Sequence, residues 1–345
     1  MGARASWVDY AKAIGIILVV YGHVARGLYN AGIDVPADLY VLLDSIVYSF
    51  HMPLFFFLSG LFFYSSFQRR GGKALIFNKI DTIFYPYLLW SILQGGIEVL
   101  LSNYTNGSVH LSDVLSLLWA PRAQFWFLYA LFAIFIVVTL IYSIGSKPYK
   151  ALCIVIFALS ATLYIFPVII SGVSLSLYLS SNLVFFSLGI VFTKYFDVKY
   201  FSNRKAVLLS ACAFVAAQWL FHGYMGLLYI DKGVATLLLA VVSIIFIVSL
   251  TSFLALKEVP FLRAVGAASM AIFLAHILAG SGIRVVLNKF FGVNSFEVHL
   301  VLGCLVGIVL PMIFFELVNR FKVPYVFSAP MSNIVKLFAG KNGRS

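Results

Sequence analysis

Long apolar runs recur along the sequence from residue 7 to residue 320, and they leave few folds open to it. A helix needs about 20 apolar residues to cross the hydrocarbon core of a bilayer. Charged or turn-rich segments divide the sequence into ten such runs, at approximately 7–29, 41–64, 80–101, 125–144, 150–168, 174–193, 206–222, 233–255, 266–288 and 298–320. Charged residues make up only 10% of the chain, against about 25% in soluble proteins. The sequence therefore predicts an all-α, polytopic membrane protein with about ten transmembrane helices.

The distribution of basic residues predicts the orientation of these helices. If the runs alternate across the membrane, one side carries only Arg26, Arg122, Lys232, Arg284 and Lys289 of the 24 lysines and arginines. The other side, which includes both termini, is then the cytoplasm, because basic residues concentrate there. This topology accounts for the net charge of +12 without nucleic acid as a partner. We expect residues 1–345 to form a single domain in the cell inner membrane, in contact with lipid. We also expect the first helix to be retained and residues 321–345 to form a basic cytoplasmic tail.

The first run, "DYAKAIGIILVVYGHVARG", contains two ionisable residues, Lys12 and His23. A lysine at the centre of a membrane helix costs about 2.5 to 3.5 kcal/mol, so such residues are rare unless they have a function. Eleven residues separate the two positions, which is about 16 Å along a helix. Alternatively, Lys12 extends to the headgroups and His23 is a hydrogen-bonded packing residue. The sequence thus indicates a cation near the cytoplasm and an imidazole in the outer half of the membrane.

The second run has a similar character. In "YSFHMPLFFFLSGLFF", residues 48–63, His51 and Pro53 interrupt the helix, and Ser59-Gly60 allows another helix or a ligand to come close. The alternative interpretation is a helix kink with close packing.

Several motifs, in order, give the sequence a resemblance to a known family. They are the Lys12-x10-His23 spacing, "FHMPLFFFLSG", "FYPYLLWS" (residues 84–91), "FWFLYALF" (residues 125–132) and "VGAASMAIFLAH" (residues 265–276). In this order they resemble the membrane acyltransferase-3 family, and the chain is similar to stand-alone bacterial members that acetylate cell-surface polysaccharides. The resemblance spans helices one to four and nine.

The resemblance implies a ten-helix fold that uses acetyl-CoA from the cytoplasm and acylates a glycan hydroxyl, with the membrane portion alone completing the transfer. Lys12 and His23 occupy positions that are essential in the family. Members often have two arginines before the proline of helix three, where this chain reads "FNKIDTIFYP" with Lys79 and Thr82. Many members also have a histidine before the Trp-Phe-Leu of helix four, where this chain has Gln124-Phe125.

Acetyl transfer from a thioester to an alcohol needs a base, a stabiliser for the oxyanion and a site for the CoA phosphates. We assign His23 as the general base or as a transiently acetylated nucleophile, two roles that the sequence does not separate. Asp44, or a tyrosine such as Tyr48, is a candidate to orient it. The candidates for phosphate contacts on the cytoplasmic side are Lys12, Arg69, Arg70 and Lys79. Ordinary positive-inside anchoring is the alternative for these cations.

Four further residues are candidates with common structural alternatives. Ser59 is a candidate hydrogen-bond donor in the site, although membrane serines often bond their own backbone. Trp126 is a candidate wall for a sugar or acyl chain, although interfacial tryptophans anchor helices. His276 and Arg284, eight residues apart and near one helix face, are candidates to contact the acceptor, and headgroup anchoring is the alternative for Arg284.

The sequence predicts no metal site, because its histidines lack the spacing of zinc ligands and its three cysteines lie far apart. The predicted function is thus a membrane O-acyltransferase dependent on acetyl-CoA. The main alternative is a transporter or flippase of a glycan intermediate, which favours internal repeats that the sequence does not show. A further alternative is a non-catalytic scaffold or sensor. The sequence indicates neither the acceptor hydroxyl nor the oligomeric state.

Overall fold

A computed structural model describes residues 6–33, 36–100, 110–145, 149–168 and 173–333, and all the regular elements in these ranges are helical. Short π-helical or 3₁₀ turns (η) lie between several of the α-helices. The α-helices are α1 (Ser6–Asn30), α2 (Ala37–Tyr48), α3 (His51–Leu61), α4 (Phe63–Arg70), α5 (Gly72–Lys79), α6 (Tyr85–Leu100), α7 (Leu111–Leu115), α8 (Trp126–Ile144), α9 (Tyr149–Ile165), α10 (Ser174–Tyr195), α11 (Arg204–Gln218), α12 (Val234–Leu254), α13 (Pro260–Ala267), α14 (Ser269–Phe291) and α15 (Phe296–Arg320).

Nine helical segments in the described ranges are long and apolar enough to cross a membrane. The tenth predicted run, at 150–168, corresponds to α9, an apolar helix of 17 residues that is shorter than the other nine. The prediction of an all-α, polytopic membrane protein is therefore confirmed. The sidedness of the termini stays a prediction, since the structure contains no membrane.

The second and third candidate spans are each divided into shorter helices. The second consists of α2, α3 and α4, and α3 begins at His51 with Pro53 in its first turn, where proline removes no helical hydrogen bond. The predicted interruption at this point is confirmed. The third span consists of α5, a π-helical turn η1 (Ile80–Phe84) and α6. Such turns inside helices often mark functional sites.

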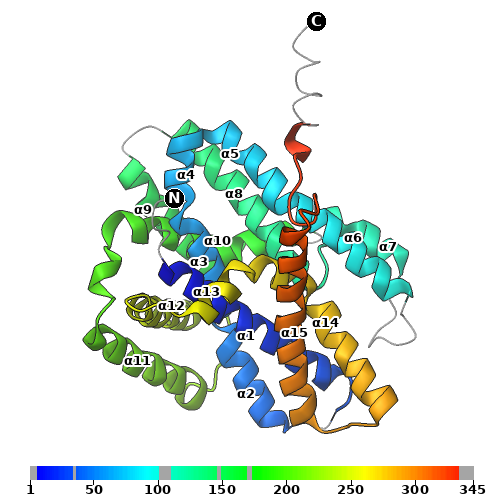
Figure 1. Cartoon of the computed structure of the whole chain (residues 1–345). Helices are drawn as coiled ribbons and strands as arrows, with labels where there is room; N and C mark the ends of the chain where they lie inside the picture. Colours follow the sequence, from blue (N-terminus) through cyan, green and yellow to red (C-terminus); the bar gives the residue numbers. More distant parts are fainter. Residues whose placement is uncertain (1–5, 34–35, 101–109, 146–148, 169–172, 334–345) are drawn as a thin grey trace, which may run out of the picture.

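Helix α1 lies in the interior of the bundle and contacts α2, α3, α12, α13, α14 and α15. Figure 1 shows α1 in dark blue between α13 on one side and α14 and α15 on the other. Residues such as Ala11, Ala13 and Val20 on α1 are fully buried. Any polar side chain on this helix is therefore surrounded by other helices, not by lipid alone.

Helices α3 and α10 approach each other through a pair of glycines. A Cβ atom at Gly60 would lie 2.0 Å from the carbonyl oxygen of Phe186, and one at Gly189 would lie 2.2 Å from that of Phe57. Small residues allow membrane helices to pack backbone to backbone in this way. The close approach predicted at Ser59-Gly60 is thus made by another helix.

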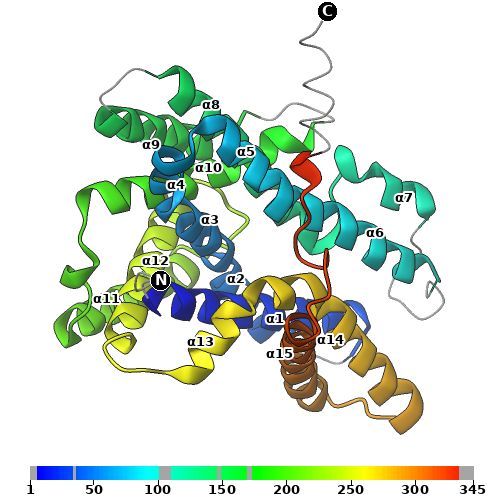
Figure 2. The ribbon, with the colours of Figure 1, turned by 45° about the horizontal axis from the view of Figure 1, so that its top comes forward.

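The chain continues past α15 along α6. Figures 1 and 2 both show the orange-red segment after α15 running beside the cyan helix α6. This segment covers residues 321–333, so the first half of the predicted tail at 321–345 is packed on the protein. The rest of that tail, 334–345, lies outside the described residues.

Candidate functional site

Two histidines from distant parts of the sequence form a pair in the helix bundle. The ring centroids of His23 on α1 and His276 on α14 are 5.1 Å apart, with the planes inclined at 57°. The two helices pack directly against each other. Helix α14 therefore supplies His23 with a neighbouring imidazole.

The hydrogen bonds of His276 determine which of its two ring nitrogens carries the proton. Its Nδ1 lies 2.9 Å from the carbonyl oxygens of both Ile272 and Phe273. Because a carbonyl oxygen only accepts, Nδ1 carries the proton, and Nε2 of the neutral ring has a free lone pair. His276 is 1% exposed, and among the described residues its Nε2 has no hydrogen-bond partner. A buried basic nitrogen thus lies on the ring that packs against His23.

A third histidine and a tyrosine adjoin this pair. His51, 1% exposed on α3, donates from Nδ1 to the carbonyl oxygen of Val47 at 2.7 Å. The Tyr48 ring packs edge-on against His51, with centroids 4.4 Å apart. The Tyr48 ring also fills the space beside Gly22, where a Cβ would be 2.8 Å from it. Tyr48 therefore lies against the residue that precedes His23.

Asp44, predicted to orient His23, is bound by Arg26. Arg26 donates two hydrogen bonds of 2.8 Å, one to each carboxylate oxygen of Asp44, and a third of 2.9 Å to the Tyr229 hydroxyl. Its guanidinium carbon lies 3.4 Å from the centroid of the Tyr48 ring. Arg26 in turn interacts electrostatically with His23. Asp44 is thus held by Arg26, three residues after His23 on α1, and an orienting role for Asp44 stays a prediction.

Lys12 lies in a pocket at the other end of α1. The pocket is open to the surface and has a cavity volume of about 200 Å³, and its lining includes Lys12, Ser59, Ser66 and Lys79. The Lys79 ammonium lies 4.1 Å from the centroid of the Phe135 ring, which also lines the pocket. Two lysines on one pocket favour an anionic ligand. Two of the four predicted phosphate contacts, Lys12 and Lys79, therefore share one site.

The other two predicted phosphate contacts lie at the end of α4. Arg69 and Arg70 are both exposed, in the last turn of that helix. Arg70 interacts electrostatically with Lys79, which places its charge near the pocket. Neither arginine lines the pocket itself.

Ser59 lies in the lysine pocket and not beside the histidines. Its hydroxyl donates to the carbonyl oxygen of Phe55 at 2.8 Å, one turn earlier in α3. This is the backbone bond that serines in membrane helices commonly make. A direct chemical role for Ser59 stays a prediction.

Trp126 and Arg284 make interhelical contacts. Trp126 stacks on Tyr178 of α10, with centroids 5.5 Å apart and planes at 19°. Arg284 donates to the carbonyl oxygen of Gly27 at 2.7 Å. It therefore binds the last turn of α1, where a cation is favourable. Roles for both residues in acceptor binding stay predictions.

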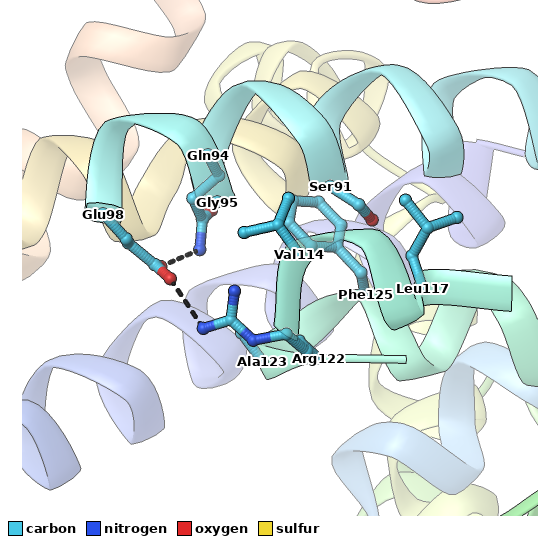
Figure 3. A pocket seen from close by; sticks show the side chains of 9 residues that line it. All are labelled: Ser91, Gln94, Gly95, Glu98, Val114, Leu117, Arg122, Ala123 and Phe125. Atoms are coloured by element: carbon cyan, nitrogen blue, oxygen red, sulfur yellow. Dashed lines mark hydrogen bonds and ion pairs between the residues drawn. The ribbon is translucent and has the colours of Figure 1, made fainter. Parts of the chain in front are cut away.

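A second, smaller pocket lies between α6 and the loop before α8. Figure 3 shows Glu98 accepting from both Gln94 and Arg122, at 2.8 and 3.0 Å. Gln94 also accepts a 2.7 Å hydrogen bond from Nε2 of Gln124. These polar side chains largely satisfy one another, which is how buried polar groups are stabilised.

Two residues near the His23–His276 pair, Arg26 and Tyr229, were not predicted from the sequence as parts of a site. Arg26 follows His23 by three residues, so the two lie on one face of α1, and this spacing was an available signal. Tyr229 comes from a loop 203 positions away from Arg26. The proximity of Tyr229 to α1 depends on tertiary packing, which no local sequence pattern encodes.

Comparison with known proteins identifies the family. A family model described as "Acyltransferase domain", that of the acyltransferase-3 family, matches residues 5–316. The chain therefore belongs to the acyltransferase-3 family, as its motifs indicated.

Two curated relatives are similar over part of the chain. The nodulation protein NolL of Mesorhizobium japonicum is 30% identical over 131 residues, which is 38% of this chain and 34% of the relative. The nodulation protein NolL of Sinorhizobium fredii is 26% identical over 215 residues, 60% of this chain and 54% of the relative. The matches thus span between a third and about half of the relatives' length. No solved structure matches the chain.

Proposed function

We propose that the protein is a membrane O-acyltransferase that moves an acetyl group from cytoplasmic acetyl-CoA to a hydroxyl of a cell-surface glycan or its lipid-linked precursor. The observation that carries this proposal is the placement of two polar sites on one unbroken helix. Helix α1 presents Lys12 to the two-lysine pocket and His23 to the histidine pair. The eleven residues between them span about 16 Å.

The two-lysine pocket is the proposed donor site. Lys12 and Lys79, which both line this pocket, bind phosphate groups of CoA as point charges. The pantetheine arm separates the phosphates of CoA from its thioester. For transfer at His23, phosphates held at the Lys12 end require this arm to extend along α1 toward His23.

His23 is the proposed reacting group, by one of two routes. As a general base it takes the proton of the acceptor hydroxyl, whose oxygen attacks the thioester carbonyl. The C–S bond then breaks, and the CoA thiolate takes the proton back from the imidazolium. As a nucleophile, the imidazole nitrogen itself bonds the acetyl carbon while the C–S bond breaks and CoA leaves as the thiolate. The acceptor hydroxyl oxygen then attacks the acetyl-imidazolium, the C–N bond breaks to restore the neutral imidazole, and the hydroxyl proton passes to the CoA thiolate.

His276 is the proposed partner of His23 in either route. Its Nε2 lone pair is buried and without a partner among the described residues, so it is available to accept a hydrogen bond from the His23 ring. A histidine that is oriented by such a bond presents its other nitrogen in one tautomer. His276 therefore fits a positioning role better than the acceptor contact predicted from sequence.

The test is acetyl transfer in membranes that contain the protein, with labelled acetyl-CoA as donor and extracted surface glycan as product. We expect label in the glycan with the wild type and none with His23→Ala at equal membrane abundance. His299→Ala is the control, because it removes an imidazole from another apolar helix, α15, where His299 is buried and bonds a backbone carbonyl, that of Val293 at 2.8 Å. Transport of glycan without labelled product would favour a flippase instead.

A further inference from the structure

The segment after α15, residues 321–333, is here named the C-terminal strap, and residues 325–327 in its middle bind α6. The Tyr85 hydroxyl donates to the Tyr325 carbonyl oxygen at 2.8 Å, and Trp90 Nε1 donates to the Val326 carbonyl oxygen at 3.0 Å. The Phe327 ring lies parallel to that of Trp90, at 6°. Figures 1 and 2 show the strap beside α6 from both directions.

The strap ends in a two-point contact with Asp81. Oδ1 of Asp81 accepts from the Ser332 backbone N–H, and Oδ2 accepts from the Ser332 hydroxyl, both at 2.7 Å. Ser332 is 3% exposed and lies in a helical turn that begins after Pro330. Backbone N–H groups at a helix start lack partners within the helix, so the carboxylate satisfies one of them from another element. Bonds to a charged acceptor are stronger than neutral ones.

Asp81 lies between two residues of the lysine pocket. It belongs to the π-helical turn η1, with Lys79 two residues before it and Ile83 two residues after it, and both of these line the pocket with Lys12. Positions two residues apart lie on roughly opposite sides of a helical turn. One side of η1 therefore faces the pocket while the other is held by Ser332.

We propose that the Asp81–Ser332 contact positions η1, and with it Lys79, for binding the donor. The C-terminal strap does not line the donor pocket, but it holds the turn that carries one of the pocket's lysines. This inference rests on the proposed function. The strap follows residue 316, where the match to the family model ends. Asp81 and Ser332 are accordingly positioning residues, and neither is proposed to touch the substrate.

The variants are chosen to change one bond at a time. Ser332→Ala removes the hydroxyl bond to Asp81 and keeps the backbone bond, whereas Ser332→Thr restores the hydroxyl. Ser202→Ala is the matched control, because the Ser202 hydroxyl bonds only a nearby backbone carbonyl, that of Lys199 at 3.0 Å. Each variant is compared as the full-length protein in membranes.

Two measurements separate this inference from the proposed function. The first is the rate at which an amine reagent labels Lys79, read by mass spectrometry, which needs no activity. We expect Ser332→Ala to raise this rate several-fold, and Ser332→Thr and Ser202→Ala to match the wild type. The second is the KM for acetyl-CoA, which we expect Ser332→Ala to raise about tenfold with kcat nearly unchanged.

Unchanged Lys79 labelling in Ser332→Ala would overturn the inference, whatever the activity. Raised labelling with an unchanged KM would also overturn it, because the contact would then not serve the donor. If the labelling rises but the wild type transfers no acetyl group from acetyl-CoA, the coupling of Ser332 to Lys79 is supported, and the proposed donor is wrong.

Discussion

At the scale of single residues, the pairing of His23 with His276 explains why a histidine is kept in this part of α1. His23 is partly buried, and an imidazole that is taken out of water without partners is costly. Here the ring contacts a second imidazole whose Nδ1 is held by two carbonyl oxygens of its own helix. The arrangement fixes the His276 ring and leaves its Nε2 without a hydrogen-bond partner among the described residues. Such a fixed partner is what a catalytic histidine requires.

A substitution at His276 can test the role of Nε2 separately from that of Nδ1. The amide N–H of asparagine can replace Nδ1–H as the donor to Ile272 and Phe273, but it leaves no basic group in the place of Nε2. We expect His276→Asn to fold and to lose about 10² to 10⁴ of the acetyl-transfer rate. Wild-type kcat in this variant would show that His276 only fills space.

The Arg26–Asp44 contact gives a prediction about stability. Removing the charge of Asp44 weakens the hydrogen bonds of the partly buried Arg26 guanidinium. We expect this to lower the free energy of unfolding by about 1 to 3 kcal/mol. We expect Asp44→Asn to lower the melting temperature of the purified protein, and Arg26→Gln/Asp44→Asn to lose less than the sum of the single changes. Strict additivity would contradict a direct contact.

At the scale of elements, the sequence predicted the helices better than their contacts. The bounds of α1, α10 and α15 lie within a few residues of the apolar runs, because apolar length decides where a helix can cross a bilayer. Lys12 and His23 do lie on one unbroken helix. The partner His276 is 253 positions away from His23, and nothing in a local pattern encodes that proximity. The π-helical η1 and the strap were missed for the same reason.

The glycine contact between α3 and α10 allows a matched test of packing. A methyl group at Gly60 would meet the Phe186 carbonyl oxygen at 2.0 Å, so the helices must separate. We expect Gly60→Ala to cost about 1 to 3 kcal/mol of stability or more. Gly96→Ala on α6 has no atom within 4 Å of the added methyl and should be neutral or slightly stabilising. Thermal unfolding in detergent measures both, and equal effects would refute the close approach.

At the scale of the whole molecule, the account requires a donor site on the cytoplasmic side and chemistry nearer the outer side. The charge distribution predicts this orientation. In a variant without the native cysteines, we expect Ser112→Cys to react with a membrane-impermeant maleimide on intact cells. The Glu258 side chain is 78% exposed, and we expect Glu258→Cys to react only after the cells are opened. The reverse pattern would invert the topology and place Lys12 outside.

The central claim is that α1 binds the donor at Lys12 and performs the transfer at His23. The most direct test is the dependence of the acetyl-transfer rate on acetyl-CoA concentration in Lys12→Ala and His23→Ala membranes. Loss of a charged phosphate contact should raise KM about tenfold or more and leave activity at saturation. Loss of His23 should abolish turnover at every concentration. Wild-type turnover in His23→Ala, or an unchanged KM in Lys12→Ala, would contradict the account.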